Sequence, residues 1–411
     1  MKVFKGLLVA FVLVSITVFA IPNELITIAV IDSPVDQDHE TLAGVIDQEM
    51  MDSIKLTDSE GKEKSWAQLN QEMQAEIKKR LNQGRYADQV QFLDAVAQIN
   101  KDPKAISKLE GSTALTRLKN LLFGMIKMKF SKKFRKELDL VGTYLHGTHV
   151  SGIAVQSLTK IRLITYPLLG IPSQIKAREI WNFKEDEFRA QAKAKWAAIG
   201  DGLRQAGTRV VNLSIGASNE TALKSVQKNT SLITKILTVG KREKYAKTIA
   251  RITIEEMGEF FKANPDIIFV MAAGNESEQL DLTKAEGKPN TALLQIPNVV
   301  QVASANEKGE IDKFSNMSGS EVEIAAKGAG VKSALVGGGQ VHMTGTSMAA
   351  PVVTNRIAEL ISINPEMTVE QTLTKLYADH SWNSAGLNDL TVEGRMLTDS
   401  RPGTSDSIVA L

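Results

Sequence analysis

The sequence contains no cysteine in its 411 residues. Disulfide bonds, zinc–thiolate sites, a thiol nucleophile and lipid attachment to cysteine are therefore excluded. Charge of one sign is also scarce, because 49 lysine and arginine residues face 47 aspartate and glutamate residues and leave a net charge of +2. So small an excess creates no overall field that would attract nucleic acid, and we expect no nucleic-acid partner.

The overall composition is that of a folded globular protein, with 43% hydrophobic and 23% charged residues. This balance excludes wholesale disorder, a collagen-like chain and a coiled coil. The length alone allows two or three domains of about 150 residues each. It also supplies enough apolar material for a large core.

Residues 1–20 have the pattern of a secretory signal peptide. Lys2 and Lys5 precede an apolar run that starts at Gly6, and small residues at positions 18 and 20 fit a signal-peptidase site. The run is shorter than the roughly 20 residues that span a bilayer, and no later stretch free of charges is long enough. We therefore expect a secreted or periplasmic protein without a stable membrane span, the alternative being that the run is retained as an anchor.

Short β-branched runs alternate along the chain with stretches of helical periodicity, which predicts an α/β fold with a mostly parallel sheet. The predicted strands are residues 26–31, 161–166, 209–213, 267–272 and 299–304. Asp32, Ser214 and Asn275 each come shortly after one of these runs. Ligands bind at the carboxyl ends of parallel strands, so these residues are candidates for one site.

Two charged helical stretches interrupt this alternation, and both resemble insertions or a lid. They cover residues 50–140 and 219–250. Within the first, residues 127–136 hold six basic side chains interleaved with apolar ones. This cluster fits either the solvated face of a helix or a surface that binds anionic membranes or acidic partners. Residues 381–411 form a polar C-terminal extension, which is either an extra strand or a loose end.

Two of the five histidines lie close together, at His146 and His149, and a distant Gly-Thr-Ser sequence ends at Ser347. Ser347 precedes a predicted helix with Pro351 in its first turn. A serine at a helix N-terminus has free backbone N–H groups beside it, which suit an oxyanion. Its hydroxyl needs a base, and the base needs a carboxylate to orient it. Asp32, His146 and Ser347 would supply this set, with His149 as a structural histidine.

Asp, His and Ser occur in this order within sequences that resemble those of the subtilase family (peptidase S8) of serine peptidases. The similar segments are AVIDSPVD at 29–36, HGTHVSGIA at 146–154, VVNLSIG at 210–216, MAAGNES at 271–277 and GTSMAAPVV at 345–353. The resemblance implies a subtilisin-like three-layer α/β fold with helices on both faces of the sheet. It also implies a serine endopeptidase domain over residues 21–380.

The resemblance assigns a role to each matching residue. Ser347 would be the nucleophile, His146 the general base and Asp32 the residue that orients it, while Asn275 and the Ser347 backbone N–H would form the oxyanion hole. Two further segments would bind the substrate backbone and line the first specificity pocket, where small residues favour apolar or aromatic side chains. They comprise Ser214, Ile215, Gly216, Ala272, Ala273 and Gly274.

Four features depart from the family pattern. Pro34 stands where the family has glycine, so the turn beside Asp32 must be built differently. Residues 39–42 read HETL in place of a calcium-binding sequence, and we expect no metal and no cofactor. Only five residues separate the expected cleavage site from the first strand, which leaves no room for a folding pro-domain. Asp32 and His146 lie 114 residues apart, because the first insertion separates them.

These observations predict an exported serine endopeptidase that acts on protein or peptide substrates through an acyl-enzyme. The helical insertion could gate the cleft, bind a partner or replace the pro-domain. The alternative from another class is a catalytically impaired, subtilase-fold binding or scaffold protein. A third interpretation is a membrane-surface adaptor that binds through residues 127–136.

Overall fold

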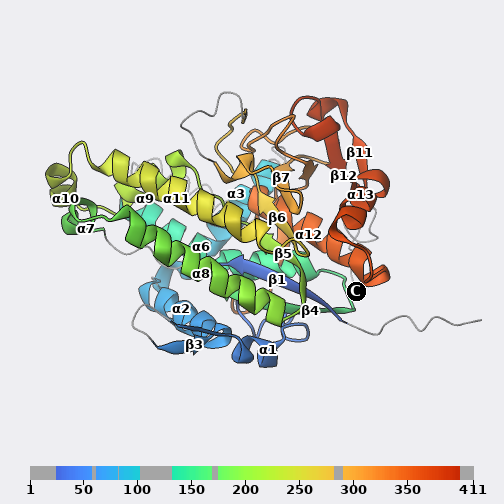
Figure 1. Ribbon diagram of the computed structural model, residues 1–411, viewed down its shortest axis with the longest axis horizontal. Helices are drawn as coiled ribbons and strands as arrows, with labels where there is room; N and C mark the ends of the chain where they lie inside the picture. Colours follow the sequence, from blue (N-terminus) through green and yellow to red (C-terminus); the bar gives the residue numbers. More distant parts are fainter. Residues whose placement is uncertain are drawn as a thin grey trace, which may run out of the picture.

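An eight-stranded sheet forms the centre of the computed structural model, which describes residues 25–57, 62–81, 83–101, 132–168, 175–281 and 290–398. The strand order is β11-β12-β8-β7-β6-β5-β1-β4, and every neighbouring pair is parallel except β11 and β12 (Figure 1). The strands are β1 (Ile26–Asp32), β4 (Ile161–Pro167), β5 (Thr208–Leu213), β6 (Ile268–Ala272), β7 (Val299–Ser304), β8 (Ile324–Ala326), β11 (Ser381–Asn383) and β12 (Arg395–Leu397). The five predicted strands are all present in this sheet.

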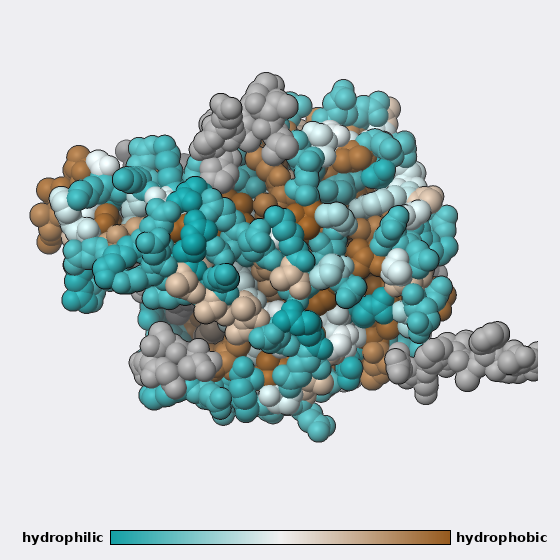
Figure 2. All heavy atoms as spheres, viewed as in Figure 1, coloured by the Kyte–Doolittle hydropathy of each residue, from teal (hydrophilic) through white to brown (hydrophobic). Residues whose placement is uncertain are grey.

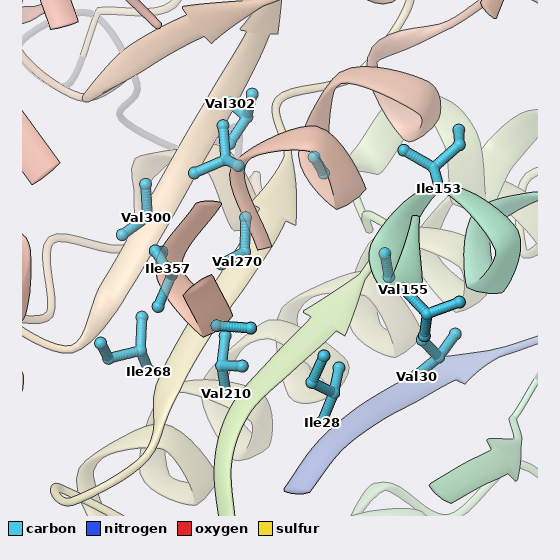
Figure 3. Packing of buried hydrophobic residues seen from close by; sticks show 14 of the residues in the cluster. Ile28, Val30, Ile153, Val155, Val210, Ile268, Val270, Val300, Val302 and Ile357 are labelled. Carbon is cyan, nitrogen blue, oxygen red and sulfur yellow. The ribbon is translucent and has the colours of Figure 1, made fainter. Parts of the chain in front are cut away.

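Helices cover both faces of the sheet, which confirms the predicted three-layer α/β fold. On one face, α6 (Lys132–Val155) and α12 (Thr346–Ile363) pack against side chains such as Ile28, Val30 and Val210 (Figure 3). On the other face, α8 (Glu185–Gln205) and α11 (Arg242–Lys262) pack against the alternate residues of the same strands. The central strands are buried on both sides and are therefore apolar at nearly every position.

The first insertion packs into the core over much of its described length. It contains α1 (Gln48–Ser53), a hairpin of β2 (Lys55–Thr57) and β3 (Glu63–Ser65), α2 (Trp66–Arg80) and α3 (Tyr86–Lys101). Ser65 starts α2 with a capping box in which Gln68 is the partner. Trp66 is fully buried and its ring lies 5.0 Å from that of Tyr166 on β4. The described part of this insertion is thus anchored to the sheet.

The end of the first insertion and the predicted histidine segment share one helix, α6, which runs through residue 140 without a break. A second hairpin, of β9 (Val331–Ala334) and β10 (Gln340–Met343), packs against α6 and α3. The backbone N–H and the ring of His342 both bond to Asp94 of α3. This pair joins the insertion to the segment that leads into α12.

The second insertion consists of α9 (Asn219–Lys228), α10 (Leu232–Leu237) and the first half of α11. The expected boundary at residue 250 falls inside α11, so the insertion does not end at a break in structure. It continues into the core, where Phe260 and Phe261 are buried. The short helix α7 (Ala177–Trp181) lies beside α10 at one end of the molecule (Figure 1).

After α13 (Val369–Asp379), part of the C-terminal extension belongs to the central sheet. β11 and β12 come from this extension, and Met396 of β12 pairs with Ala325 of β8. Within the described ranges, no helix is both long and apolar enough to cross a bilayer. Residues 1–20 and residues 127–131 of the basic cluster lie outside the described residues, and residues 132–136 of the cluster belong to α6.

Candidate active site

Asp32 and His146 form the first half of the site, 114 residues apart in the chain. Asp32 is the last residue of β1 and is fully buried, and its Oδ1 lies 2.6 Å from Nδ1 of His146 on α6. Burial lowers the pKa of His146, but the charge and hydrogen bond of Asp32 outweigh that effect and raise the pKa above its ordinary value. With Nδ1 bound to the carboxylate, Nε2 is the nitrogen that can act as a base.

The turn after Asp32 is held by its own side chains and by the backbone of α6. The Ser33 N–H donates to Asp32 Oδ1 at 2.6 Å, and the Ser33 hydroxyl accepts from the backbone N–H of Gly147 at 2.8 Å. Gly147 is required there, because an added Cβ would lie 2.2 Å from the Ser33 carbonyl oxygen. These contacts dock the start of the His146 segment against the end of β1.

Pro34 has no backbone N–H group to donate, and the turn after Asp32 is held through the next residue. Its neighbour Val35 exchanges two hydrogen bonds with the amide of Asn70 on α2, both 2.8 Å long. The second carboxylate oxygen of Asp32, Oδ2, is buried without a hydrogen-bond partner among the described residues. Asn70 is buried and belongs to the insertion, so the insertion completes the turn that carries Asp32.

His149, one turn beyond His146, has a structural environment. Its Nε2 lies 3.1 Å from the Val331 carbonyl oxygen and 3.0 Å from that of Val341, which ties α6 to both strands of the β9–β10 hairpin. Burial lowers the pKa of His149 to about 3, so the ring is neutral at physiological pH. This agrees with the structural role predicted for it.

Ser347 is the second residue of α12, where a backbone N–H has no acceptor within the helix. It is only partly buried, between fully buried neighbours. Its hydroxyl donates to the carbonyl oxygen of Ser214 at 3.2 Å, and the Ser214 hydroxyl donates back to the Ser347 carbonyl oxygen at 2.7 Å. Among the described residues no hydrogen bond joins Ser347 to His146.

Pro351 explains the second of these bonds. It lies in the second turn of α12, not in the first turn as predicted from the sequence, because the helix already begins at Thr346. A residue at this position would normally donate its N–H to the carbonyl of Ser347, but proline has none. The freed carbonyl accepts from the Ser214 hydroxyl instead.

Asn275 lies beside the start of α12. Its Oδ1 accepts from the Thr346 backbone N–H at 2.8 Å and from the Thr346 hydroxyl at 3.1 Å. A Cβ added to Gly345 would lie 3.5 Å from Asn275 Nδ2 and 3.7 Å from the Ser347 backbone nitrogen, so both groups border the same point, and Asn275 is exposed to solvent. Two N–H donors at one exposed point can stabilise a developing negative charge.

Asn316, which the sequence did not indicate, holds the loop that carries Asn275. Its Oδ1 accepts from the backbone N–H groups of Glu276 and Glu278, each at 3.0 Å, and its Nδ2 donates to the Ala273 carbonyl at 3.0 Å. The loop passes so close to Asn316 that an added Cβ on Gly274 would lie 2.4 Å from its Nδ2. Asn316 is fully buried, so its position is fixed by packing as well.

The remaining predicted site residues extend two neighbouring strands. Residues 214–216 follow β5 and residues 272–274 end β6, and these strands pair in parallel. Gly216 is exposed, Ile215 and Gly274 are partly buried, and Ala272 and Ala273 are buried. Both segments therefore leave the sheet at the edge where Asp32 also lies.

At residues 39–42, where we expected no calcium site, side chains bond to another part of the protein. His39 is buried and its Nε2 lies 2.9 Å from the Gly339 carbonyl oxygen, while the Glu40 carboxylate accepts from the Gly339 N–H at 2.9 Å. These bonds hold the turn of the β9–β10 hairpin. Groups of three or more potential metal-ligating side chains do not occur in the described part of the chain.

The structure thus brings Asp32 and His146 into contact, and places Ser347, Asn275 and Ser214 around the start of α12. Sequence reasoning missed Ser33, Asn70 and Asn316. Proline at position 34 indicated that the turn after Asp32 needed another hydrogen-bonding group, although it did not identify Asn70. Nothing in the sequence indicated Asn316.

Comparisons with known proteins identify similar sequences and a similar fold. The family model for the subtilase family matches residues 23–395. Subtilisin-like protease 1 of Plasmodium berghei (strain Anka) is 32% identical over 142 residues, which cover 31% of this chain and 23% of that protein. Subtilisin NAT of Bacillus subtilis subsp. natto is 33% identical over 110 residues, which cover 27% of each. The chain therefore matches only about a quarter of the length of these relatives.

One solved structure has the same fold at low sequence identity. The epidermin leader peptide processing serine protease from Staphylococcus aureus superposes with a TM-score of 0.50 and 15% identity. The superposition covers 92% of this chain and 75% of that chain. At this identity the likeness concerns the fold alone.

Proposed function

The chain belongs to the subtilase family, and from that premise we propose that it is a serine endopeptidase that hydrolyses peptide bonds through an acyl-enzyme. The observation that carries the proposal is the 2.6 Å contact between Asp32 and His146, at the edge of the sheet where Ser347 begins α12. A buried carboxylate against an imidazole fixes the tautomer that a general base needs. The other contact between a histidine and an aspartate among the described residues, His342 with Asp94 at 2.8 Å, has a partly exposed carboxylate, whereas Asp32 is fully buried.

In the proposed mechanism, Ser347 Oγ attacks the carbonyl carbon of the scissile bond and His146 Nε2 accepts its proton. The carbonyl oxygen becomes an oxyanion, which the Ser347 N–H and Asn275 Nδ2 stabilise. His146 then gives the proton to the leaving amine, so that the acyl-enzyme forms. A water molecule, deprotonated by His146, hydrolyses the ester in the same way. Asp32 stays ionised and stabilises the imidazolium.

For this step the Ser347 hydroxyl must turn from the Ser214 carbonyl toward His146. Rotation about χ1 moves the hydroxyl of an unbranched serine side chain between staggered positions at little cost. Catalytic hydrogen bonds are often long or misaligned without substrate and tighten when it binds. The contact with Ser214 is therefore compatible with a resting state of the same site.

We propose that an extended peptide binds along residues 214–216 and 272–274. Residues 214–216 follow the last paired residue of β5, and Gly216 is exposed, so their backbone is the proposed place for a peptide to pair. Ala272, Ala273 and Gly274 are small, which favours an apolar or aromatic side chain in the first pocket. Protein or peptide chains are thus the proposed substrates, and no cofactor is required.

For the first insertion we favour a bracing role over a lid. Asn70 bonds to the turn beside Asp32, and Asp94 bonds to His342 near the start of α12. A deletion of residues 55–134 would remove the buried Trp66, and it would therefore test folding rather than gating. The export signal at residues 1–20 remains a proposal, which N-terminal sequencing of the secreted protein would check.

Labelling with a fluorophosphonate probe tests the proposed activity. The wild-type protein should form a covalent adduct on Ser347, and Ser347→Ala should form none and lose about 10⁶-fold in kcat on a peptide substrate. Ser362→Ala is a matched control on the same helix, because the Ser362 hydroxyl only caps its own helix turn. An unlabelled wild type with an intact fold would favour the alternative of a catalytically impaired binding or scaffold protein.

A further inference from the structure

The helix α10 exposes its apolar side chains and buries its polar ones, which is the reverse of the usual distribution. Leu232 and Ile233 are 74% and 71% exposed, and Ile236 is 65% exposed. The polar Thr234 and Thr238 on its other side are buried, and the Thr238 hydroxyl donates to the Thr234 carbonyl. A helix selected only for folding would bury the aliphatic residues and expose the threonines. The exposed face thus has a purpose other than stability.

Most of the exposed large apolar side chains of the described residues are gathered at this one place. Six of the nine lie on α10, on the turn after it and on the neighbouring α7. Figure 2 shows them as a brown tip at the left end of the molecule, where Figure 1 places α10 and α7. We call this group the apolar tip; it consists of Trp181, Leu232, Ile233, Ile236, Leu237 and Val239. A contiguous exposed patch of this kind marks an interaction surface.

The apolar tip is held in place by defined contacts. The Trp181 indole N–H donates to the Leu237 carbonyl at 3.1 Å, which links α7 to the end of α10. The Ser231 side chain caps the start of α10 by accepting from the Thr234 N–H. The backbone N–H of Ile175 donates to the Asn229 carbonyl at 2.8 Å. The aliphatic side chains are therefore presented by a braced structure.

Basic residues flank the apolar tip in the sequence. Residues 224–247 contain seven lysine or arginine residues and a single acid, Glu243. Three of the seven are neutralised by the pairs Lys224–Glu220, Lys228–Asp139 and Lys247–Glu243. Four have no ion pair with any described residue, and they are Lys235, Lys241, Arg242 and Lys244. The Lys241 ammonium lies 3.4 Å from the centre of the Trp181 ring.

We propose that the apolar tip docks onto an anionic lipid bilayer, with its aliphatic side chains in the interface and its unpaired cations against the headgroups. The tip projects from one end of the molecule (Figure 2). Binding to a bilayer does not require a complementary pocket in a partner. Unpaired lysines next to an aliphatic surface complement anionic headgroups. A tryptophan whose indole N–H is hydrogen-bonded and whose ring is exposed is typical of the headgroup region of a bilayer.

The absence of cysteine from the sequence allows a direct test with the full chain. Ile233→Cys introduces a single thiol at the tip, and Ile363→Cys introduces one at an equally exposed site, 72% exposed, on α12. Each thiol is modified with a nitroxide, and vesicles of phosphatidylcholine with or without phosphatidylglycerol are added. The label at 233 should become more accessible to oxygen and less accessible to a water-soluble nickel complex on anionic vesicles. The label at 363 should not change.

Vesicle flotation measures the contribution of each feature. The double variant Ile233→Ser/Val239→Ser should bind anionic vesicles at least about tenfold more weakly, since each loses most of its apolar surface. Ile363→Ser should bind as the wild type does. Lys235→Gln/Lys244→Gln should lose about fivefold for each lysine and part of the salt sensitivity. Lys308→Gln is the matched control on another exposed loop.

Three results would overturn the proposal. The first is a label at 233 that stays as accessible to water on anionic vesicles as in buffer. The second is protection of this label without vesicles that increases with protein concentration, which would indicate a second copy of the chain on the tip. The third is equal vesicle binding by the wild type and the serine double variant. Residues 1–24 are the same in all variants. Vesicle binding through that segment alone would leave the accessibility of the label at 233 unchanged.

Discussion

Ser214 and Ser347 exchange two hydrogen bonds, each donating its hydroxyl to the carbonyl oxygen of the other. The residues are 133 positions apart, and the pair joins the segment after β5 to the first turn of α12. One of these bonds exists because Pro351 has no N–H to give to the Ser347 carbonyl. A substrate-binding segment and the proposed nucleophile are thus positioned by one reciprocal contact.

Ser214→Ala should therefore impair catalysis through the position of Ser347. The Ser347 carbonyl would lose its only side-chain donor, and we expect a stability loss of about 1–3 kcal/mol together with a lower kcat. Pro351→Ala supplies the helical N–H that the wild type lacks. A double-mutant cycle should show that Pro351→Ala recovers part of the stability lost in Ser214→Ala. Additive effects, measured by urea unfolding, would contradict this coupling.

The contact between Asp32 and His146 predicts the pH dependence of hydrolysis. Asp32 raises the pKa of His146, and only the neutral imidazole can accept the Ser347 proton. Activity should therefore fall as the pH is lowered through a pKa above the ordinary histidine value. Asp32→Asn removes the charge that outweighs burial, so the inflection in kcat/KM should move to lower pH.

The same variant should lose about 10⁴-fold in kcat, because an asparagine amide no longer fixes the productive tautomer. Asp36→Asn is a suitable control, since Asp36 lies in the same loop but bonds to the hairpin N–H of Gly337 rather than to His146. An unchanged inflection in Asp32→Asn would show that Asp32 does not control the base.

Asn70 links the first insertion to the proposed triad. Asn70→Ala removes both hydrogen bonds to Val35 and leaves its buried backbone groups without partners. We expect a loss of about 2–4 kcal/mol in unfolding free energy and a lower kcat with little change in KM. Gln74→Ala, one turn further along α2, removes no hydrogen bond to Val35 and should change neither. An insertion that merely covers the cleft would instead give a change in KM.

The sequence was sufficient to predict five of the eight strands and the polar residues at or just after the ends of three of them. Runs of β-branched residues that are buried on both sides are apolar throughout, so β1 and β5 to β7 were evident without the structure. Asp32, Ser214 and Asn275 stood out because each polar residue follows such a run. Parallel strands end at one edge, and this rule alone places these three residues together.

The positioning residues could not be predicted, because their roles depend on contacts made far along the chain. Asn70 is 35 residues from Val35, and Asn316 is 40 residues from Glu276. A single asparagine in a helix or loop carries no local signal for such a contact. Periodicity likewise indicated that residues 232–237 are helical, but it could not show that their aliphatic side faces solvent.

Variants of Asn275 and Asn316 distinguish a residue that acts in the reaction from one that holds the oxyanion loop. Asn275→Ala removes the proposed donor together with the acceptor of two hydrogen bonds from Thr346, so we expect kcat to fall about 10²–10³-fold and the unfolding free energy to fall by about 1–3 kcal/mol.

Asn316→Ala leaves two backbone N–H groups and the Ala273 carbonyl without their partner inside the protein. It should therefore lower both the unfolding free energy, by about 2–4 kcal/mol, and kcat. Asn316→Asp keeps the acceptor for Glu276 and Glu278, but it loses both donor bonds and places a buried carboxylate against that of Glu276, so it should lower the unfolding free energy as well. If Asn316→Ala destabilised the protein and left kcat unchanged, the loop would not depend on Asn316 for its catalytic geometry.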